Sequence, residues 1–170
     1  MDDPTYTLKQ VVSILSSRAD TDPPAHRIAR SIRHWTALDL LVPIAGKETG
    51  TGVSRRYTAD EVRKAAILVE LSRYRIPAPV LEETFPGVSE DWPERPAWRD
   101  AIAGRNPIFL FMTYSEALTA YQLIPADAVV TMLQPASDRP PEPQPDHMPK
   151  IEIYSAIVIN VTRLFASLNL

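Results

Sequence analysis

The sequence contains no cysteine, which excludes disulfide bonds and metal sites built from thiolates. Glycine is scarce, with five residues in 170, and three of them, Gly46, Gly50 and Gly52, fall within one short segment. No run approaches the ~18 consecutive apolar residues that a membrane-spanning helix needs. The N-terminal residues lack the basic and apolar regions of a signal peptide, so we expect a cytoplasmic protein with no membrane partner.

The composition is that of a globular protein with a core, since apolar residues make up 45% and charged residues 23% of the chain. A length of 170 residues suits one medium domain or two small ones. Charge is unevenly distributed: residues 26–75 carry a net +5, residues 76–170 a net −6 and residues 1–25 a net −2. A basic module joined to an acidic one is typical of nucleic-acid binding by part of a chain, although a solvated helix surface explains the same charges equally well.

Capping signals mark the starts of two helices in the first half of the chain. Thr7 is a candidate N-cap for a short amphipathic helix whose apolar stripe is formed by Leu8, Val11, Val12 and Leu15. Asp22 can cap a second helix that runs from about Pro24 to about Leu38. Pro23 fits the first position of that helix, where a missing N–H is tolerated.

The second helix has an apolar side and a basic side. Ile28, Ile32 and Trp35 recur at the spacing of one helical face, which predicts that they pack against the body of the domain. The side chains that point away from that face are Arg27, Arg30, Arg33 and His34. After the helix the segment "DLLVP" turns away, and Pro43 prevents any continuation.

The glycine-rich segment "AGKETGTGVSRRY" predicts a hairpin tip from which a short strand, Val53–Tyr57, leaves. A capping box formed by Thr58 and Glu61 then opens a third helix over "ADEVRKAAILVELSRYRI". Pro77 and Pro79 end this helix, and "PAPVLEETF" is consistent with one more short helix.

The order helix, turn, helix, glycine-rich hairpin, helix is that of a winged helix-turn-helix. In that arrangement the second helix can lie in the DNA major groove, which is about 12 Å wide, and the wing presents cations to flanking phosphates. Over roughly residues 5–83 the sequence resembles the MerR-like winged-helix DNA-binding family. The similar segments are "YTLKQVVSIL", "SIRHWTALDLLVP" and "SRRYTADEVRKAAILVELSRYRIPAPVLEE".

This resemblance implies a DNA-contact surface on the second helix and the wing. It implies that Arg33 and His34 touch DNA, that Trp35 packs at the helix edge and that Arg56 lies where the wing meets phosphate. The predicted DNA-binding residues are Arg27, Arg30, Ser31, Arg33, His34, Lys47, Arg55, Arg56 and Tyr57. The alternative for the arginines is a solvated charged surface, and for His34 an exposed helix histidine. Tyr57 also fits a role in packing the wing on the body.

Other chemistry finds little support in the sequence. No nucleophile, phosphate-loop or dinucleotide motif occurs, and His26 and His147 have no carboxylates at metal-ligand spacing. We therefore expect no enzyme activity, no cofactor and no metal.

Two features depart from the family pattern: the segment between the first two helices is longer than a tight turn, and prolines after Ile76 exclude the long helix through which family members commonly dimerise.

The second half predicts a different organisation. We expect a winged-helix domain over residues 1–85, an acidic, proline-rich linker over 86–96 and a small α/β domain over 97–170, which makes the chain α+β. In the second domain "AWRDAIAG" predicts a short helix ended by Gly104, and "IFLFMTY" and "AVVTML" predict strands. A proline-rich loop follows over 134–149, then a strand in "KIEIYSAIVINV" and a helix in "TRLFASLNL".

These patterns together predict a sequence-specific DNA-binding transcriptional regulator. Because two-fold DNA readers bind paired half-sites as dimers, we expect a homodimer formed through the apolar second half, which could also hold an effector or contact the transcription machinery or another protein. Two alternatives remain open. One is an architectural or excisionase-like accessory factor of recombination or phage functions, and the other is a protein-interaction adaptor built on a winged helix.

Overall fold

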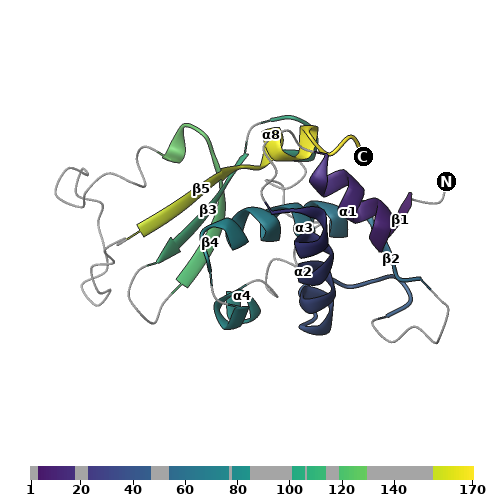
Figure 1. The fold of residues 1–170 in the computed structure, drawn as a ribbon. Helices are drawn as coiled ribbons and strands as arrows, with labels where there is room; N and C mark the ends of the chain where they lie inside the picture. The colour runs from purple at the N-terminus through teal and green to yellow at the C-terminus, as the bar shows by residue number, and fades with distance from the viewer. Residues whose placement is uncertain are drawn as a thin grey trace, which may run out of the picture. The chain divides into compact units, whose positions relative to one another are not determined.

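The computed structural model describes residues 4–17, 23–46, 54–76, 78–84, 101–105, 107–113, 119–129 and 155–170. Contacts within the chain divide it into two compact units. The first unit contains residues 1–94 and 163–170, and the second contains residues 95–162. Helices and small antiparallel sheets are both present, which agrees with the predicted mixed α+β class (Figure 1).

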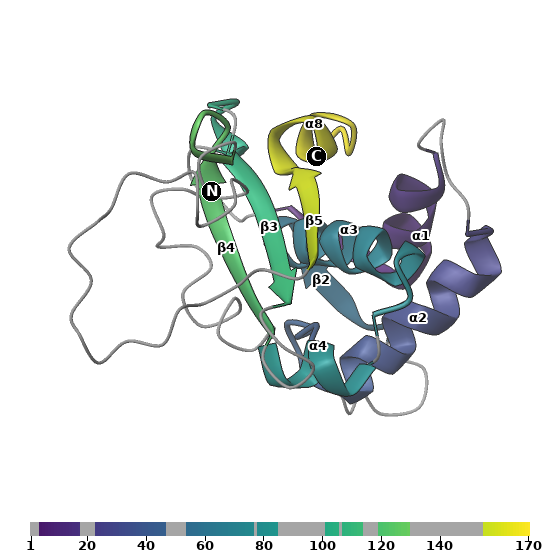
Figure 2. The same cartoon turned by 90° about the vertical axis from the view of Figure 1, so that its left-hand side faces the viewer.

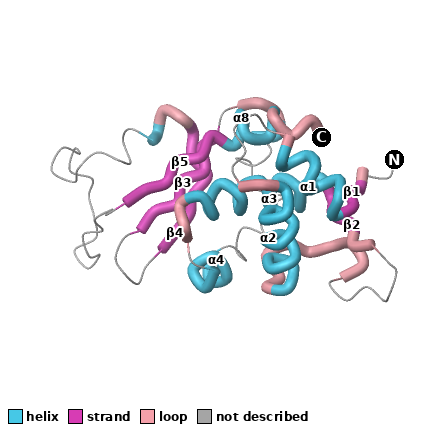
Figure 3. The backbone as a smooth tube through the Cα atoms, in the orientation of Figure 1, coloured by secondary structure: helices cyan, strands magenta, loops and turns pink. Residues whose placement is uncertain are grey.

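The first unit is built mainly from helices. Its elements are β1 (Thr5–Thr7), α1 (Leu8–Ser16), α2 (Ala25–Ala37), β2 (Arg56–Thr58), α3 (Ala59–Arg73) and α4 (Ala78–Thr84). Helices α1 and α2 pack against each other, and β1 pairs antiparallel with β2 next to α1 (Figure 3). In the described parts of the chain, no helix combines the length and apolar character needed to cross a membrane.

Helix α1 begins as its sequence predicts. Thr7 is the N-cap, and its side-chain oxygen accepts a hydrogen bond from the Gln10 backbone at 3.4 Å. In return, the Gln10 side-chain oxygen accepts from the Thr7 backbone N–H at 2.8 Å, which completes a capping box. Val11 and Leu15 are buried, so the predicted apolar stripe of α1 faces the core.

The predicted N-cap of α2 is wrong. Pro24 is the N-cap, in an extended conformation and without a side-chain hydrogen bond, and the first helical residue is Ala25. The physical reason is that Pro24 disfavours the helical conformation of the residue before it, so Pro23 cannot open the helix. The carbonyl of Pro24 accepts the first helical bonds, from Arg27 and Ile28.

The exit segment, residues 38–46, follows α2 and contains both buried and exposed residues. Leu38 is the C-cap, and Asp39 follows in the left-handed conformation with φ 58°. The Leu40 N–H then donates back to the Trp35 carbonyl at 2.9 Å, which satisfies one of the last helical acceptors. Leu40, Leu41 and Pro43 are buried and belong to the core, whereas Val42 and Ile44 in the same segment are exposed.

Strand β2 is displaced from its prediction. We expected a strand over Val53–Tyr57, whereas the observed strand is Arg56–Thr58, and residues 51–53 lie outside the described residues. Its partner is β1, with Tyr6 opposite Tyr57, a pairing the sequence did not predict. The Ile44 N–H also donates to the Arg56 carbonyl at 2.9 Å, so the exit segment lies beside β2.

Helix α3 lies in the core of the first unit, since nine of its fifteen residues are buried. Thr58 is its N-cap, and the Thr58 side chain accepts from the Glu61 backbone at 3.2 Å. The helix ends at Arg73, earlier than Pro77 required, because Arg75 adopts the left-handed conformation with φ 57°. The predicted short helix after it is present as α4.

The second unit contains an antiparallel three-stranded sheet in the order β4-β3-β5 (Figure 2). Its strands are β3 (Pro107–Thr113), β4 (Thr119–Pro125) and β5 (Ser155–Asn160). Strand β5 lies within its predicted segment, and β3 matches "IFLFMTY" except that it begins one residue earlier, at Pro107. Strand β4 was missed, and the strand expected in "AVVTML" is wrong at Ala128 and Val129, which are helical. The apolar run "AVVTML" has a higher local strand propensity than the mixed sequence of β4. The strand conformation of β4 comes from its pairing with β3.

The C-terminus departs from the predicted domain boundary. Helix α8 (Val161–Ala166) has the predicted apolar spacing, with Val161, Leu164, Phe165 and Leu168 buried. Residues 163–170 nevertheless group with the first unit, whereas the sequence assigned them to the second domain. The expected linker over 86–96 and the proline-rich loop over 134–149 lie outside the described residues, and so do residues 97–100 of "AWRDAIAG". In the rest of that segment Ala101 and Ile102 are helical, and Gly104 has the left-handed conformation with φ 77°.

The left-handed conformation of Arg75 gives a prediction about stability. Arg75 is exposed and follows the C-cap of α3, the position where helices prefer glycine. We expect Arg75→Gly to raise the free energy of unfolding by about 1 kcal/mol, because glycine adopts this conformation without the steric cost of a side chain. Arg75→Ala is the control, since it removes the same charge but keeps the steric cost. Urea denaturation would contradict the explanation if both variants were stabilised equally.

Candidate nucleic-acid interface

The exposed side of α2 carries only positive and neutral side chains. Arg27, Arg30, Arg33 and His34 are all exposed, as their positions in the sequence predict. Helix α2 contains no acidic residue, and among the described residues no carboxylate is paired with any of the three arginines. Within the described residues, the helix therefore presents a cationic surface without acidic partners, hereafter the α2 cation face.

The opposite side of α2 holds the helix in the first unit. Ile28 and Ile32 are fully buried and Trp35 nearly so, which confirms the predicted packing face. Because side chains of a helix repeat every 3.6 residues, burial of this side turns the arginines outward. Ser31 is half-buried between the two sides and is less accessible than the cations.

The predicted wing residues have different environments. Arg56 is exposed, and its Nε donates to the Thr5 hydroxyl at 2.9 Å, which connects the cation to β1. Arg55 is half-buried, and Lys47 lies outside the described residues. The structure thus describes two of the three predicted wing cations, next to the exit segment that follows α2.

Tyr57 is a correction to the predicted contact set. Its side chain is only 1% exposed, so it cannot reach a ligand on the surface. The Tyr57 hydroxyl lies 3.0 Å from the hydroxyl of Thr36, which itself donates to the Ile32 carbonyl at 2.8 Å. Since a threonine hydroxyl has one proton, Tyr57 is the donor. This buried bond joins β2 to α2, the packing role that was the other interpretation of Tyr57.

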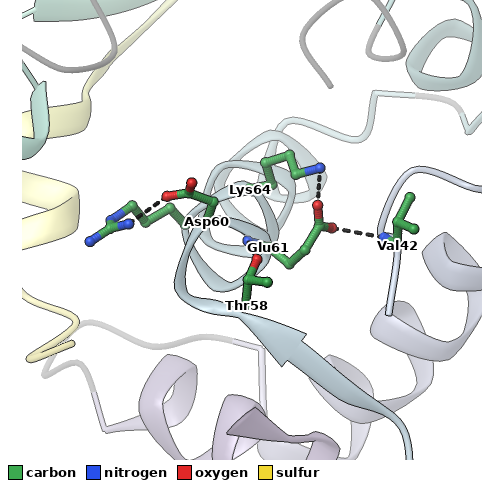
Figure 4. Close-up of polar contacts among 6 residues, drawn as sticks. Val42, Thr58, Asp60, Glu61 and Lys64 are labelled. Carbon is green, nitrogen blue, oxygen red and sulfur yellow. Dashed lines mark hydrogen bonds and ion pairs between the residues drawn. The ribbon is translucent and has the colours of Figure 1, made fainter. Parts of the chain in front are cut away.

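A second buried polar contact joins the exit segment to α3. The carboxylate of Glu61 accepts a hydrogen bond from the Val42 backbone N–H at 2.8 Å through Oε2, and its Oε1 forms an ion pair with the Lys64 ammonium (Figure 4). Both charged side chains are buried. Thr58 therefore caps α3 as predicted, but the Glu61 side chain does not complete the capping box, because it binds Val42 and Lys64.

The sequence contained one indication of this cluster. Glu61 and Lys64 stand at i and i+3, a spacing that allows an ion pair on a helix, and they sit among apolar residues of α3. Nothing local indicated that the Val42 amide, 19 residues earlier, would share the carboxylate.

Burial raises the pKa of the Glu61 carboxyl above its ordinary value. The nearby Lys64 charge and the hydrogen bonds from Lys64 and Val42 act in the opposite direction and lower this pKa, while the neighbouring Asp60 charge raises it. Desolvation is the largest of these effects, so the folded chain holds the Glu61 proton more tightly than the unfolded chain does.

Comparisons with known proteins add no family to this description. No protein-family model matches the chain, and no curated protein matches it significantly. In the described parts of the chain, no cluster of three or more histidine or acidic side chains has the arrangement of a metal site. The α2 cation face, with Arg55 and Arg56 of the predicted wing, is the candidate site.

The raised pKa of Glu61 predicts a pH dependence of stability. We expect the free energy of unfolding of the wild type, measured relative to Glu61→Gln, to fall as pH rises above 4.5, the ordinary value for this carboxyl. The sign follows because the folded state binds more protons than the unfolded state in this window, and the glutamine does not titrate. Urea denaturation between about pH 4 and pH 6.5 measures the difference.

The matched control is Glu82→Gln, which removes an exposed carboxylate from α4. This variant shows how much of the change follows from the loss of any carboxylate, whether buried or exposed. A wild-type advantage over Glu61→Gln that grows with pH would show that the ion pair with Lys64 outweighs desolvation.

Proposed function

We propose that the first unit is a MerR-like winged helix-turn-helix that binds double-stranded DNA, and that the chain is a sequence-specific transcriptional regulator. The observation that carries this proposal is the α2 cation face, which is exposed, free of acidic residues and opposite a buried apolar side. DNA phosphates are the abundant cellular surface that such a face complements.

The dimensions of α2 support a place in the major groove. Thirteen residues give a helix about 20 Å long. With its side chains an α-helix is about 10–12 Å across, which suits a groove about 12 Å wide. Arg33 and His34 are then candidates for contacts to base edges, and Arg27 and Arg30 for contacts to phosphate. Helix α1, packed against α2, would cross the backbone as the first helix of such motifs does.

The wing supplies a second set of cations in this proposal. The Nε of Arg56 is engaged by Thr5, which orients the guanidinium and leaves its terminal N–H groups for phosphate. Lys47 and Arg55 would add charge at the same edge. Homodimerisation through the second unit would pair two such surfaces on a two-fold operator, and that unit would supply any effector or protein contact.

The proposal predicts salt-dependent binding to duplex DNA. We expect the wild type to bind random duplex at low salt with a Kd of about 10⁻⁶ M or tighter, and the slope of log K against log salt to flatten by ~0.9 for each phosphate contact removed. Arg33→Ala/Arg56→Ala should weaken binding and flatten the slope. Fluorescence anisotropy at several salt concentrations measures both quantities.

The control is Arg105→Ala/Arg163→Ala, which removes the same charge from exposed positions outside α2 and the wing. Equally weakened binding in the two double variants would mean that net charge, rather than the α2 cation face, governs binding. If the wild type does not bind at low salt, the DNA-binding proposal is wrong and the adaptor alternative becomes the better one.

Selection from a random duplex pool separates a regulator from an architectural factor. A sequence-specific regulator should yield a defined site that binds at least ~10³-fold more tightly than random duplex. Binding that bends DNA without such a preference would favour the accessory-factor alternative.

A further inference from the structure

The two elements that the proposed function places on DNA are joined by the exit segment, and one residue of α3 holds that segment. We propose that Glu61 is a positioning residue for DNA binding: its carboxylate fixes the Val42 backbone and so sets the base of the wing relative to α2. This inference rests on the proposed function, because it assigns Glu61 a task only if α2 and the wing contact DNA together.

The attachment at Val42 is made through its backbone. The Val42 side chain is 52% exposed and that of Ile44 is 56% exposed, so neither is anchored in the core by its apolar surface. The Val42 N–H, in contrast, donates to a buried carboxylate at 2.8 Å (Figure 4). A charge-assisted hydrogen bond in a buried site is short and directional, so it restricts the position of the amide more than apolar contact does.

Two residues after Val42, the exit segment contacts the strand that leads out of the proposed wing. The Ile44 N–H donates to the Arg56 carbonyl at 2.9 Å, and Arg56 is a proposed phosphate contact. The Arg56 side chain is in turn held by Thr5. Strand β2 is also held by its pairing with β1 and by the Tyr57 bond to Thr36, so the exit segment is one of several attachments of the strand that carries the wing cations. Displacement of the exit segment would remove the Ile44 attachment at Arg56, while α2 would stay anchored by Ile28, Ile32 and Trp35.

Lys64 allows the carboxylate to stay ionised at this position. Burial of a carboxylate is unfavourable unless a countercharge and hydrogen bonds compensate, and Lys64 and Val42 provide them. Buried ion pairs are often replaceable by apolar residues without loss of stability, so stability alone does not require this cluster. The feature that apolar residues could not reproduce is an acceptor aimed at the Val42 N–H.

Two double variants of equal charge and similar size isolate that acceptor. Glu61→Gln/Lys64→Met keeps a side-chain oxygen for the Val42 N–H, whereas Glu61→Met/Lys64→Met has none. Both lack the ion pair, and thermal unfolding followed by circular dichroism confirms that each is folded. Their affinity for random duplex DNA and their salt slopes are then measured by anisotropy beside the wild type.

We expect the glutamine variant to bind as the wild type does. The methionine variant should bind more weakly, with a salt slope flatter by ~0.9 for each phosphate that the displaced wing no longer neutralises. A further Arg56→Ala substitution should weaken the glutamine variant but not the methionine variant, because the wing is already displaced there. An unfolded methionine variant would also be insensitive to Arg56→Ala, so this comparison is made only if circular dichroism shows that the variant is folded.

Equal affinity and slope in the two variants would overturn the inference and show that the buried Leu41 and Pro43 suffice to place the wing. In that case wild-type binding and its dependence on Arg33 remain, so the proposed function survives. Absence of wild-type binding would overturn both. If the methionine variant does not fold, Glu61→Asp takes its place, since its carboxylate is one carbon too short to reach Val42. Unchanged DNA affinity and salt slope in that variant would equally contradict the proposal.

Discussion

Burial of one side of α2 is the constraint on which the rest of the first unit depends. Ile28, Ile32 and Trp35 are removed from water, and a rigid helix that buries these positions must turn the intervening arginines to the surface. The cationic surface is therefore a consequence of core formation, with no separate interaction needed to hold the arginines outward. Any substitution that rotates α2 would disturb packing and surface charge together.

Two buried polar contacts add orientation to this apolar core. The Tyr57 hydroxyl joins β2 to α2 through Thr36, and the Glu61 carboxylate joins the exit segment to α3 through Val42. Apolar packing fixes burial but tolerates small rotations and shifts, whereas hydrogen bonds in a site without water require one geometry. Both contacts lie close to the segment that connects α2 with β2, and the proposed two-part DNA surface needs a fixed spacing in this region.

The sheet of the second unit says less about function than the helices of the first unit do. Among its described strands, β3 pairs with β4 on one side and with β5 on the other, and both pairings are antiparallel. Strand β5 reaches β3 from more than 40 positions further along the chain. Such distant pairing makes the sheet dependent on tertiary context, and a role in dimerisation or effector binding stays a proposal.

The sequence by itself determined the local structure of the helices. The apolar spacing of α1, α2, α3 and α8, the caps at Thr7 and Thr58 and the outward arginines follow from helical periodicity and neighbouring residues, and the structure agrees with each of them. Only the tertiary structure decided the pairing of β1 with β2, the strand conformation of β4, the burial of Tyr57 and the use of Glu61 by Val42. Apart from β4, which pairs with the preceding strand, these features depend on residues 19 to 53 positions apart, as between Glu61 and Val42 or Thr58 and Thr5. No local pattern specifies which distant group will satisfy a polar atom once the core has closed around it.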